Sequence, residues 1–317
     1  MLKIVLLALV AIGVVALFML TLNSNLITTI SVGGSPWDAT VNSTGEMVYV
    51  TLENTNKVSV INDQTNQIVA NIPVGKNPNG IVFNPKTDTI YVANAGGTTV
   101  SVIDVRTNKV IANIPVGLAP NFVDINPMTN MVYVANLGSN TVSVINGNTN
   151  KVVDTIPVGK GPVGINVYPP ANTIYVANYI SSNIDVIDGN TGQIVKTISM
   201  EATSDYTTLN VKTGMLYVVD FNWNAVSVIN CKTNQIIATI KVGSQPDGIT
   251  VDPVTNMVYV VNSGSNNMSV INGNTNQVVA TIAVGKEPGS VAVDTKKDIV
   301  YVANSGSNNI SVVKGVS

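Results

Sequence analysis

A short segment that begins with tyrosine recurs along this chain at a constant interval of 42 residues. The seven tyrosines are Tyr49, Tyr91, Tyr133, Tyr175, Tyr217, Tyr259 and Tyr301. An interval of roughly 20 to 50 residues that holds this strictly is typical of repeat proteins, in which each unit is one piece of supersecondary structure. The repeat therefore constrains the fold more than any other feature of the sequence.

Each repeat unit contains four short runs rich in Val and Ile, separated by clusters of Gly, Pro, Asn and Thr. In one copy these runs occupy residues 78–85, 89–94, 100–104 and 109–114. Runs of this length and composition, bounded by turn residues, predict four β-strands per unit. Because the connections between them are tight, we expect one antiparallel sheet per unit.

The second run of the unit, residues 90–93, has no polar face and so needs a neighbouring sheet on both sides. Seven sheets arranged radially satisfy one another, which predicts an all-β, seven-bladed β-propeller of four-stranded antiparallel blades. A solenoid is the alternative. It needs atypical polar repeats at its ends, whereas the end repeats here resemble the middle ones.

The repeat columns indicate which strand lies inside and which lies outside. The fourth run carries a proline column, made up of Pro73, Pro115 and Pro157, with Lys241 in another copy. Proline cannot donate to a strand ladder and lysine discourages pairing, so we expect this run at the outer edge. The first run begins beside a glycine column, made up of Gly80, Gly164 and Gly248, where inner strands are expected to crowd around the axis.

The two ends of the chain predict how the ring closes. The last unit stops after three runs, and residues 25–30 align with the fourth-run column of the other units. The N-terminal strand is therefore expected to complete the last blade, giving a monomeric ring.

The N-terminal residues predict export. Residues 4–22 form an apolar run without charges, preceded by Lys3. As a helix this run would be about 28 Å long, close to the hydrocarbon thickness of a bilayer. We interpret residues 1–23 as a signal peptide or a retained transmembrane signal anchor, and the lack of a good cleavage site favours the anchor. Either interpretation places the propeller, residues 24–317, outside the cytoplasm, membrane-anchored or secreted.

Composition excludes several classes of function. The net charge is −2 and only 11% of residues are charged, so the chain lacks the basic face that nucleic-acid binding requires. The absence of histidine excludes a Ser-His-Asp triad and a histidine-bound metal or haem. A single cysteine, Cys231, excludes an internal disulfide, and we expect it in a solvent-facing turn.

The repeat also carries a resemblance. The Tyr-Val-Ala-Asn segments at 91, 133, 175 and 301, the Ile-Pro-Val-Gly segments at 72, 114 and 156, and pairs such as Thr107-Asn108 resemble the YVTN family of β-propeller repeats. The resemblance implies an exported or surface-associated prokaryotic protein, similar to archaeal surface-layer proteins, and it implies no particular reaction. Some related seven-bladed propellers are lactonases or cofactor-binding oxidoreductase domains, and some lactonase-like propellers hold a divalent ion on the axis.

Two sets of loops are expected on one face, called here the top face: the loops between blades and the loops between second and third strands. The column after the first proline of each unit should ring the mouth of the central channel. It reads Trp37, Asn79, Asn121, Val163, Asp205, Asp247 and Gly289, with Asp38 beside it. Converging oxygens of Asp38, Asp205 and Asp247 could bind Ca²⁺. The alternative is that these side chains support turns. The asparagines that end the second strands recur in too many units to mark a site and are expected to be structural.

The unit that begins near Met200 departs most from the consensus on the top face. Its candidate contact residues, together with one from the preceding unit, are Tyr179, Glu201, Asp205, Tyr206, Phe221 and Trp223. Large aromatic side chains on exposed loops are typical of contact surfaces. The alternative is sequence drift in one repeat, with the rings lying on each other.

Two hypotheses about function follow. The first is a non-enzymatic, cell-surface propeller that binds a protein or a glycan. The second is a Ca²⁺-dependent, lactonase-like hydrolase with its site at the top of the central channel. The absence of histidine and of a dense acidic cluster favours the first hypothesis.

Overall fold

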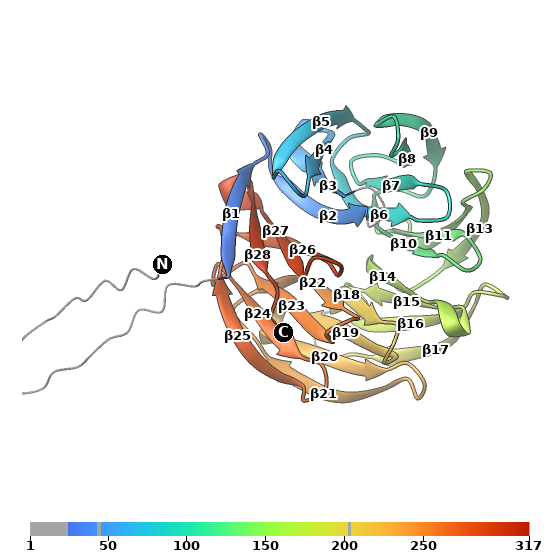
Figure 1. The fold of residues 1–317 in the computed structure, drawn as a ribbon. Helices are drawn as coiled ribbons and strands as arrows, with labels where there is room; N and C mark the ends of the chain where they lie inside the picture. Colours follow the sequence, from blue (N-terminus) through green and yellow to red (C-terminus); the bar gives the residue numbers. More distant parts are fainter. Residues whose placement is uncertain (1–24, 43–45, 202–203, 317) are drawn as a thin grey trace, which may run out of the picture.

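The computed structural model describes residues 25–42, 46–201 and 204–316, which form seven four-stranded antiparallel sheets arranged as a ring around a central channel (Figure 1). The predicted seven-bladed propeller is therefore confirmed. In each of the first six blades the strands are hydrogen-bonded in sequence order from the channel to the rim. Blade 7 differs, because its outermost strand is β1.

The strands have nearly equal lengths in all blades. Blade 1 contains β2 (Pro36–Asn42), β3 (Met47–Leu52), β4 (Lys57–Asn62) and β5 (Gln67–Pro73). Blade 2 contains β6 (Pro78–Asn84), β7 (Thr89–Asn94), β8 (Thr99–Asp104) and β9 (Lys109–Pro115). Blade 3 contains β10 (Pro120–Asn126), β11 (Met131–Asn136), β12 (Thr141–Asn146) and β13 (Lys151–Pro157). Blade 4 contains β14 (Pro162–Tyr168), β15 (Thr173–Asn178), β16 (Asn183–Asp188) and β17 (Gln193–Ser199).

The remaining blades follow the same plan. Blade 5 contains β18 (Ser204–Asn210), β19 (Met215–Asp220), β20 (Ala225–Asn230) and β21 (Gln235–Lys241). Blade 6 contains β22 (Pro246–Asp252), β23 (Met257–Asn262), β24 (Asn267–Asn272) and β25 (Gln277–Ala283). Blade 7 contains β26 (Pro288–Asp294), β27 (Ile299–Asn304), β28 (Asn309–Lys314) and β1 (Leu26–Ser31). Single 3-10 turns occur at Glu53–Thr55, Pro169–Ala171, Phe221–Trp223 and Ser305–Ser307.

Burial falls from the second strand to the rim. All six residues of β7 are buried, whereas buried or half-buried positions alternate with exposed ones along β9. Each outer strand of blades 1 to 6 also carries a β-bulge. At the bulge lies an exposed Val or Ile, such as Val69 or Ile111. Bulges of this kind twist an edge away from intermolecular strand pairing, which fits the predicted outer position.

Glycines let the inner strands approach one another closely. A Cβ atom on Gly248 would lie 2.5 Å from Cα of Ser290 in the next blade, and one on Gly80 would lie 2.7 Å from the carbonyl oxygen of Asn121. No larger residue fits without moving backbone. The expected crowding of inner strands around the axis is confirmed.

The repeated tyrosines Tyr49, Tyr91 and Tyr175 each donate a hydrogen bond to a turn of the next blade. Tyr91 Oη donates a 2.7 Å hydrogen bond to Oδ1 of Asn150, and Tyr49 Oη donates a 3.0 Å hydrogen bond to Oδ1 of Asn108. Both asparagines have positive φ, 54° and 53°, in the turn between third and fourth strands. Asparagine is one of the few non-glycine residues that adopt this conformation readily, so the turn and the tyrosine contact favour the same residue.

The asparagines at the ends of the second strands are structural, as predicted. Asn94 is fully buried, and its Nδ2 donates 3.0 Å hydrogen bonds to Oγ1 of Thr99 and Oγ of Ser101 on the third strand. Gly75 packs directly on this amide, because a Cβ there would lie 2.4 Å from Asn94 Cγ. The contact between Gly75 and Asn94 fixes the loop between blades 1 and 2 against blade 2.

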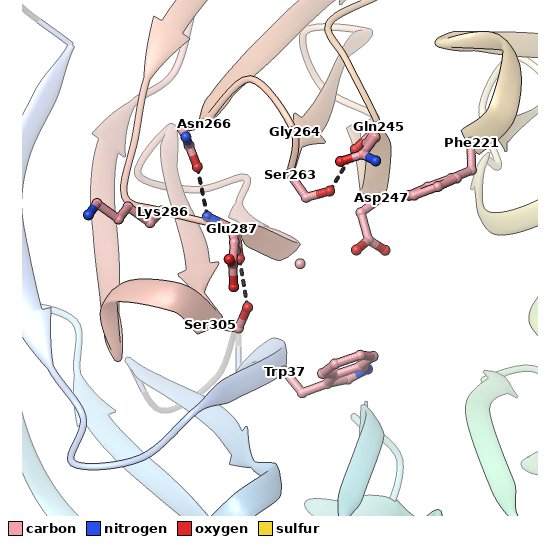
Figure 2. Close-up of a pocket in the computed structure, with 11 residues that line it drawn as sticks. Trp37, Phe221, Gln245, Asp247, Ser263, Gly264, Asn266, Lys286, Glu287 and Ser305 are labelled. Atoms are coloured by element: carbon pink, nitrogen blue, oxygen red, sulfur yellow. Dashed lines mark hydrogen bonds between the residues drawn. The ribbon is translucent and has the colours of Figure 1, made fainter.

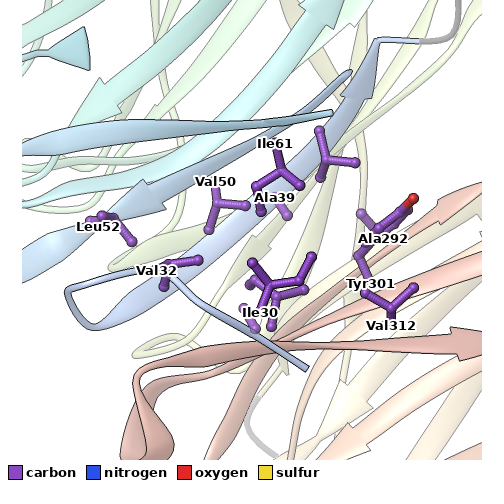
Figure 3. Packing of buried hydrophobic residues seen from close by; sticks show 12 residues of the cluster. Ile30, Val32, Ala39, Val50, Leu52, Ile61, Ala292, Tyr301 and Val312 are labelled. Carbon is purple, nitrogen blue, oxygen red and sulfur yellow. The ribbon is translucent and has the colours of Figure 1, made fainter. Parts of the chain in front are cut away.

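The predicted closure by the N-terminal strand is confirmed. β1 pairs antiparallel with β28, with Thr29 opposite Ser311. Ile30 of β1 is buried among side chains of blades 7 and 1, including Val312 and Val50 (Figure 3). The first and last strands of the described chain therefore share one sheet and one hydrophobic cluster.

Two expectations outside the blades have different outcomes. The apolar helix expected over residues 4–22 lies outside the described residues, and within them no helix is long and apolar enough to cross a membrane. The expectation that Cys231 faces solvent is wrong: this residue is buried, and its carbonyl oxygen accepts a 3.1 Å hydrogen bond from Tyr175 Oη. Burial raises the pKa of the Cys231 thiol to about 11.

Candidate functional site

The two predicted sets of loops meet on the top face. The backbone nitrogen of Ser263, in the loop after β23, donates a 2.8 Å hydrogen bond to the carbonyl oxygen of Gln245, in the loop between blades 5 and 6. Ser263 Oγ donates to the same oxygen at 2.9 Å. The contact fixes the two kinds of loop to each other.

A cavity of about 560 Å³ opens at the channel mouth between blades 1, 5, 6 and 7 (Figure 2). Trp37 borders it from blade 1 and Phe221 from blade 5, and the carboxylate of Asp247 points into the space between them. These three residues define what we call the Trp37–Phe221 pocket. The other lining residues are Gln245, Ser263, Gly264, Asn266, Lys286, Glu287, Gly289 and Ser305.

The polar wall of the pocket is fixed by hydrogen bonds within the protein. Gln245 and Glu287 occupy equivalent positions in successive loops, both with positive φ, 50° and 48°. The backbone nitrogen of Glu287 donates a 2.8 Å hydrogen bond to Asn266 Oδ1, and its carbonyl oxygen accepts a 2.8 Å hydrogen bond from Ser305 Oγ. The wall is therefore formed before any ligand binds, which reduces the entropy lost on binding.

Asp38, a predicted metal candidate, has another role. Its Oδ1 accepts hydrogen bonds from Ser290 Oγ at 2.6 Å and from the backbone nitrogen of Ala39 at 2.8 Å. Its Oδ2 accepts a 3.1 Å bond from the backbone nitrogen of Ile81. Asp38 thus joins blades 7, 1 and 2. Burial raises the pKa of its carboxyl to about 6, against the lowering effect of these donors.

The two other metal candidates, Asp205 and Asp247, occupy the same column in neighbouring blades. Burial raises the pKa of Asp205 to about 6. Burial, and after it the negative charge of Asp205, raise the pKa of Asp247 well above its usual range. The two carboxyl groups are therefore close enough to repel each other when both are ionised. Among the described residues no three His, Cys, Asp or Glu side chains are grouped so that they could hold a metal ion. Both oxygens of Asp38 already accept hydrogen bonds from the protein, and the suggested axial Ca²⁺ site stays a prediction.

Tyr206, expected beside the aromatic patch, packs toward the channel mouth. Its half-buried ring makes an edge-to-face contact with Phe122 of blade 3, with ring centroids 5.0 Å apart. The contact skips blade 4, where the equivalent position is Gly164. Burial and the charges of Asp247, Asp205 and Asp38 raise the pKa of Tyr206 well above its usual value. Tyr206 therefore lies among the acidic residues of the channel mouth.

The remaining aromatic candidates separate into two groups. Phe221 is half-buried and lines the pocket, whereas Trp223 and Tyr179 lie outside it, with exposed fractions of 44% and 39%. Lys241 Nζ donates a 3.0 Å hydrogen bond to the carbonyl oxygen of Trp223, which fixes the turn that separates the two rings. Glu201 is exposed. The structure thus brings Trp37, Asp247 and Phe221 together and leaves Tyr179, Glu201 and Trp223 outside their pocket.

The asparagines of the channel mouth carry unused acceptors. Asn79 is buried, Asn121 is half-buried, and Oδ1 of each has no hydrogen-bond partner among the described residues. Oδ1 of Asn94 and of its equivalents at the ends of the second strands also has no partner among the described residues, so this feature does not distinguish the channel mouth.

Sequence reasoning missed two parts of the site. The first is the pair Glu287 and Gln245. Other blades have a small residue at the equivalent loop position, such as Gly161 or Ala119. The larger side chains in these two loops could therefore have been recognised in the sequence. Asp124 was also missed. Its Oδ1 accepts from the backbone nitrogen of Ile125 and its Oδ2 from that of Val167, both at 2.8 Å, so it joins blades 3 and 4. Burial raises the pKa of Asp124 to about 6.

Comparison with known proteins identifies the fold. No protein-family model and no curated protein sequence matches the chain. Among solved structures, a chain of Kuenenia stuttgartiensis hydrazine synthase is similar, with a TM-score of 0.81 and 20% identity, over 93% of this chain and 98% of that chain. At this identity the likeness shows a shared propeller fold and nothing about activity. The resemblance to YVTN and surface-layer proteins stays a prediction.

Proposed function

We propose that this protein is a non-enzymatic binding protein of the cell surface, located outside the cytoplasm, whose top face holds a partner protein or glycan. The observation that carries this proposal is the Trp37–Phe221 pocket, a preformed cavity of about 560 Å³. It combines two aromatic rings with a few amide, hydroxyl and carboxylate groups, on loops whose backbones are held in place by internal hydrogen bonds. This composition is typical of binding pockets and of the centres of recognition surfaces.

The position of the N-terminus supports an outward-facing pocket. The carbonyl oxygen of Asn25 accepts a 2.7 Å hydrogen bond from the backbone nitrogen of Lys314, at the end of β28 opposite the top face. The apolar residues 4–22 precede this point closely in sequence. If they form a retained anchor, the bottom face is directed toward the bilayer and the pocket is directed away from it.

The test is recovery of partners from a native surface extract by the immobilised full-length protein. We expect a partner that the wild type retains and that the Trp37→Ala, Phe221→Ala double variant loses. The matched control is Val69→Ala with Ile111→Ala, which removes exposed apolar side chains from outer strands, away from the top face. Retention of every partner by the pocket variant, or equal loss by the control, would contradict the proposal.

A further inference from the structure

The Trp37–Phe221 pocket contains carboxyl groups that form no ion pair with a lysine or arginine of the described residues. Asp247 and Glu287 line it, and Asp205 lies next to Asp247 in the ring around the channel mouth. The ion pairs found among the described residues include none of these three carboxylates. Lys286 also lines the pocket, but its amine is directed away from Asp247 (Figure 2). Glu287 is exposed to solvent, whereas Asp247 is half-buried, so Asp247 is the carboxyl group that is costly to ionise without a cation or hydrogen-bond donors beside it.

The ionised carboxylates that line the pocket, Asp247 and Glu287, offer hydrogen-bond acceptors only. An anionic ligand would add further acceptors beside them. An ammonium group supplies up to three donors and no acceptor, which complements these carboxylates.

The third observation is the pair of aromatic side chains beside the carboxylate. Trp37 and Phe221 border the space into which Asp247 points (Figure 2). Aromatic faces attract ammonium cations through their quadrupoles, and tryptophan does so most strongly. A hydrated divalent cation would gain little from these rings, because it keeps oxygen ligands. Aromatic faces and carboxylates together therefore favour an organic cation.

We infer that the Trp37–Phe221 pocket binds an organic ammonium group, with Asp247 as its counter-ion and the two aromatic rings beside the cation and its adjoining methylene groups. This inference rests on the proposed function and names the chemistry that the same site recognises. The ammonium group belongs to a lysine side chain of a partner protein or to a free alkylamine, and the two sources share the same recognition. The cavity, about 560 Å³, holds a lysine side chain together with neighbouring peptide atoms.

The experiment measures binding to the full-length protein by titration calorimetry with three probes. Two are short peptides that are identical except for a central lysine or acetyl-lysine, and the third is cadaverine. We expect the lysine peptide to bind at least about tenfold more tightly than the acetyl-lysine peptide, since acetylation removes the charge and two donors. Tighter binding by the peptide than by cadaverine identifies a partner protein as the source, and the reverse identifies a free amine.

Two variants and one control separate the contribution of the Asp247 charge to binding from that of the Phe221 ring. Asp247→Asn removes the counter-ion at nearly constant shape, and we expect at least a tenfold loss of affinity. Phe221→Leu keeps apolar volume but removes the aromatic face, and we expect a loss of about threefold to tenfold. Glu53→Gln is the control, because it removes a half-buried carboxylate of blade 1 that does not line the pocket.

Each outcome decides the inference. Equal binding of the two peptides, or unchanged affinity of Asp247→Asn, would overturn it, as would a failure of both the lysine peptide and cadaverine to bind. The proposed function is judged separately, by whether the pocket variant loses a partner from the surface extract. Recovery of a neutral glycan through Trp37 would uphold that function and reject the ammonium group.

Discussion

Ser290 Oγ donates a 2.6 Å hydrogen bond to Oδ1 of Asp38, although the two residues are 252 positions apart in the sequence. Ser290 belongs to the inner strand of blade 7 and Asp38 to that of blade 1, so the bond crosses the place where the ring closes. Oδ2 of Asp38 continues the connection to Ile81 of blade 2. Three inner strands thus depend on one carboxyl group.

We expect strong energetic coupling between Asp38 and Ser290. Asp38→Ala leaves the Ser290 hydroxyl buried without its acceptor, and Ser290→Ala removes one donor from the Asp38 carboxyl. A double-mutant cycle by chemical denaturation should give a coupling free energy of about 1 to 3 kcal/mol. Combining Asp38→Ala with Tyr91→Phe, which share no contact, should give additive losses. Additive losses for the Asp38 and Ser290 pair would contradict the proposed closure contact.

The connections between tyrosines and turn asparagines predict a difference between two blades. Tyr91→Phe removes the hydrogen bond to Asn150 and should lower the free energy of unfolding by about 1 kcal/mol. Tyr217→Phe is the matched control, because the buried Tyr217 hydroxyl has no partner among the described residues. We expect this second substitution to be neutral or slightly stabilising. Equal losses measured by denaturant titration would show that the hydroxyl contacts do not stabilise the ring.

Deletion of residues 25–30 should open the ring. β28 would lose its partner and present an unpaired edge, and the cluster around Ile30 would be exposed. We expect a lower melting temperature and higher-order species in size-exclusion chromatography. Removal of residues 1–24 alone is the control, since it leaves β1 in place. A protein without residues 25–30 that melts and elutes like this control would disprove closure by β1.

Phe221 and Trp223 should differ in their effect on binding. Phe221 lines the pocket, so Phe221→Ala should weaken pocket binding by about 1 to 2 kcal/mol. Trp223 lies outside the pocket, and Trp223→Ala should change the affinity of a pocket ligand by less than about 0.5 kcal/mol. Both should cost far less stability than Tyr217→Ala, which removes a fully buried ring. Calorimetry measures the affinities of the variants, and thermal melting measures their stabilities. A larger loss of affinity for Trp223→Ala would place the contact surface on the outer loops.

The acidic residues of the channel mouth predict how stability depends on pH. The pKa of Asp205 is about 6 in the folded protein, above the value of 3.8 expected for an exposed aspartate. The folded state therefore binds this proton more tightly, and the resulting stabilisation is fully present below about pH 4 and is lost as the pH rises through 6. Asp38 and Asp124 act in the same direction. The charged and titratable groups facing Asp205 are Asp247, Tyr206 and, beyond it, Asp38.

We expect the free energy of unfolding to fall by a few kcal/mol between pH 4 and pH 7, as measured by urea titration. In Asp205→Asn the fall should be smaller by about 1 to 2 kcal/mol, because one titrating group is removed and Asp247 loses a like charge. Surface carboxylates that accept hydrogen bonds, such as Asp104, have a lowered pKa and oppose the trend only below pH 4. A rise in stability over this range, or an identical slope in the variant, would contradict the assignment.

The architecture was predictable because each structural requirement recurs in the sequence. Gly80 and its equivalents indicate that the inner strands approach one another closely. Asn150 and its equivalents indicate the turn between the third and fourth strands, and Asn150 also accepts the hydrogen bond from the tyrosine. The alignment of residues 25–30 with the outer-strand column was enough to predict how blade 7 is completed. Each of these inferences uses only the neighbours that every blade shares.

The site was predictable only in part, because it depends on contacts that occur once. The column after the first proline correctly placed Trp37 and Asp247 at the channel mouth. It could not show that Asp38 is committed to hydrogen bonds with two other blades, or that Tyr206 reaches Phe122 across blade 4. Phe221 and Trp223, two positions apart in one turn, point to different surroundings, and no pattern in the repeat distinguishes them.

Closure by β1 also determines how the domain responds to a pulling force. The chain enters the domain beside Lys314 at the bottom, and β1 runs from there toward the top, where the pocket lies. Tension between a fixed N-terminus and a ligand held in the pocket would act along the axis of β1. The hydrogen bonds between β1 and β28 would then be loaded in shear, all at once, rather than peeled apart in succession. The strand that completes the ring is thus also the point at which the domain would resist mechanical unfolding.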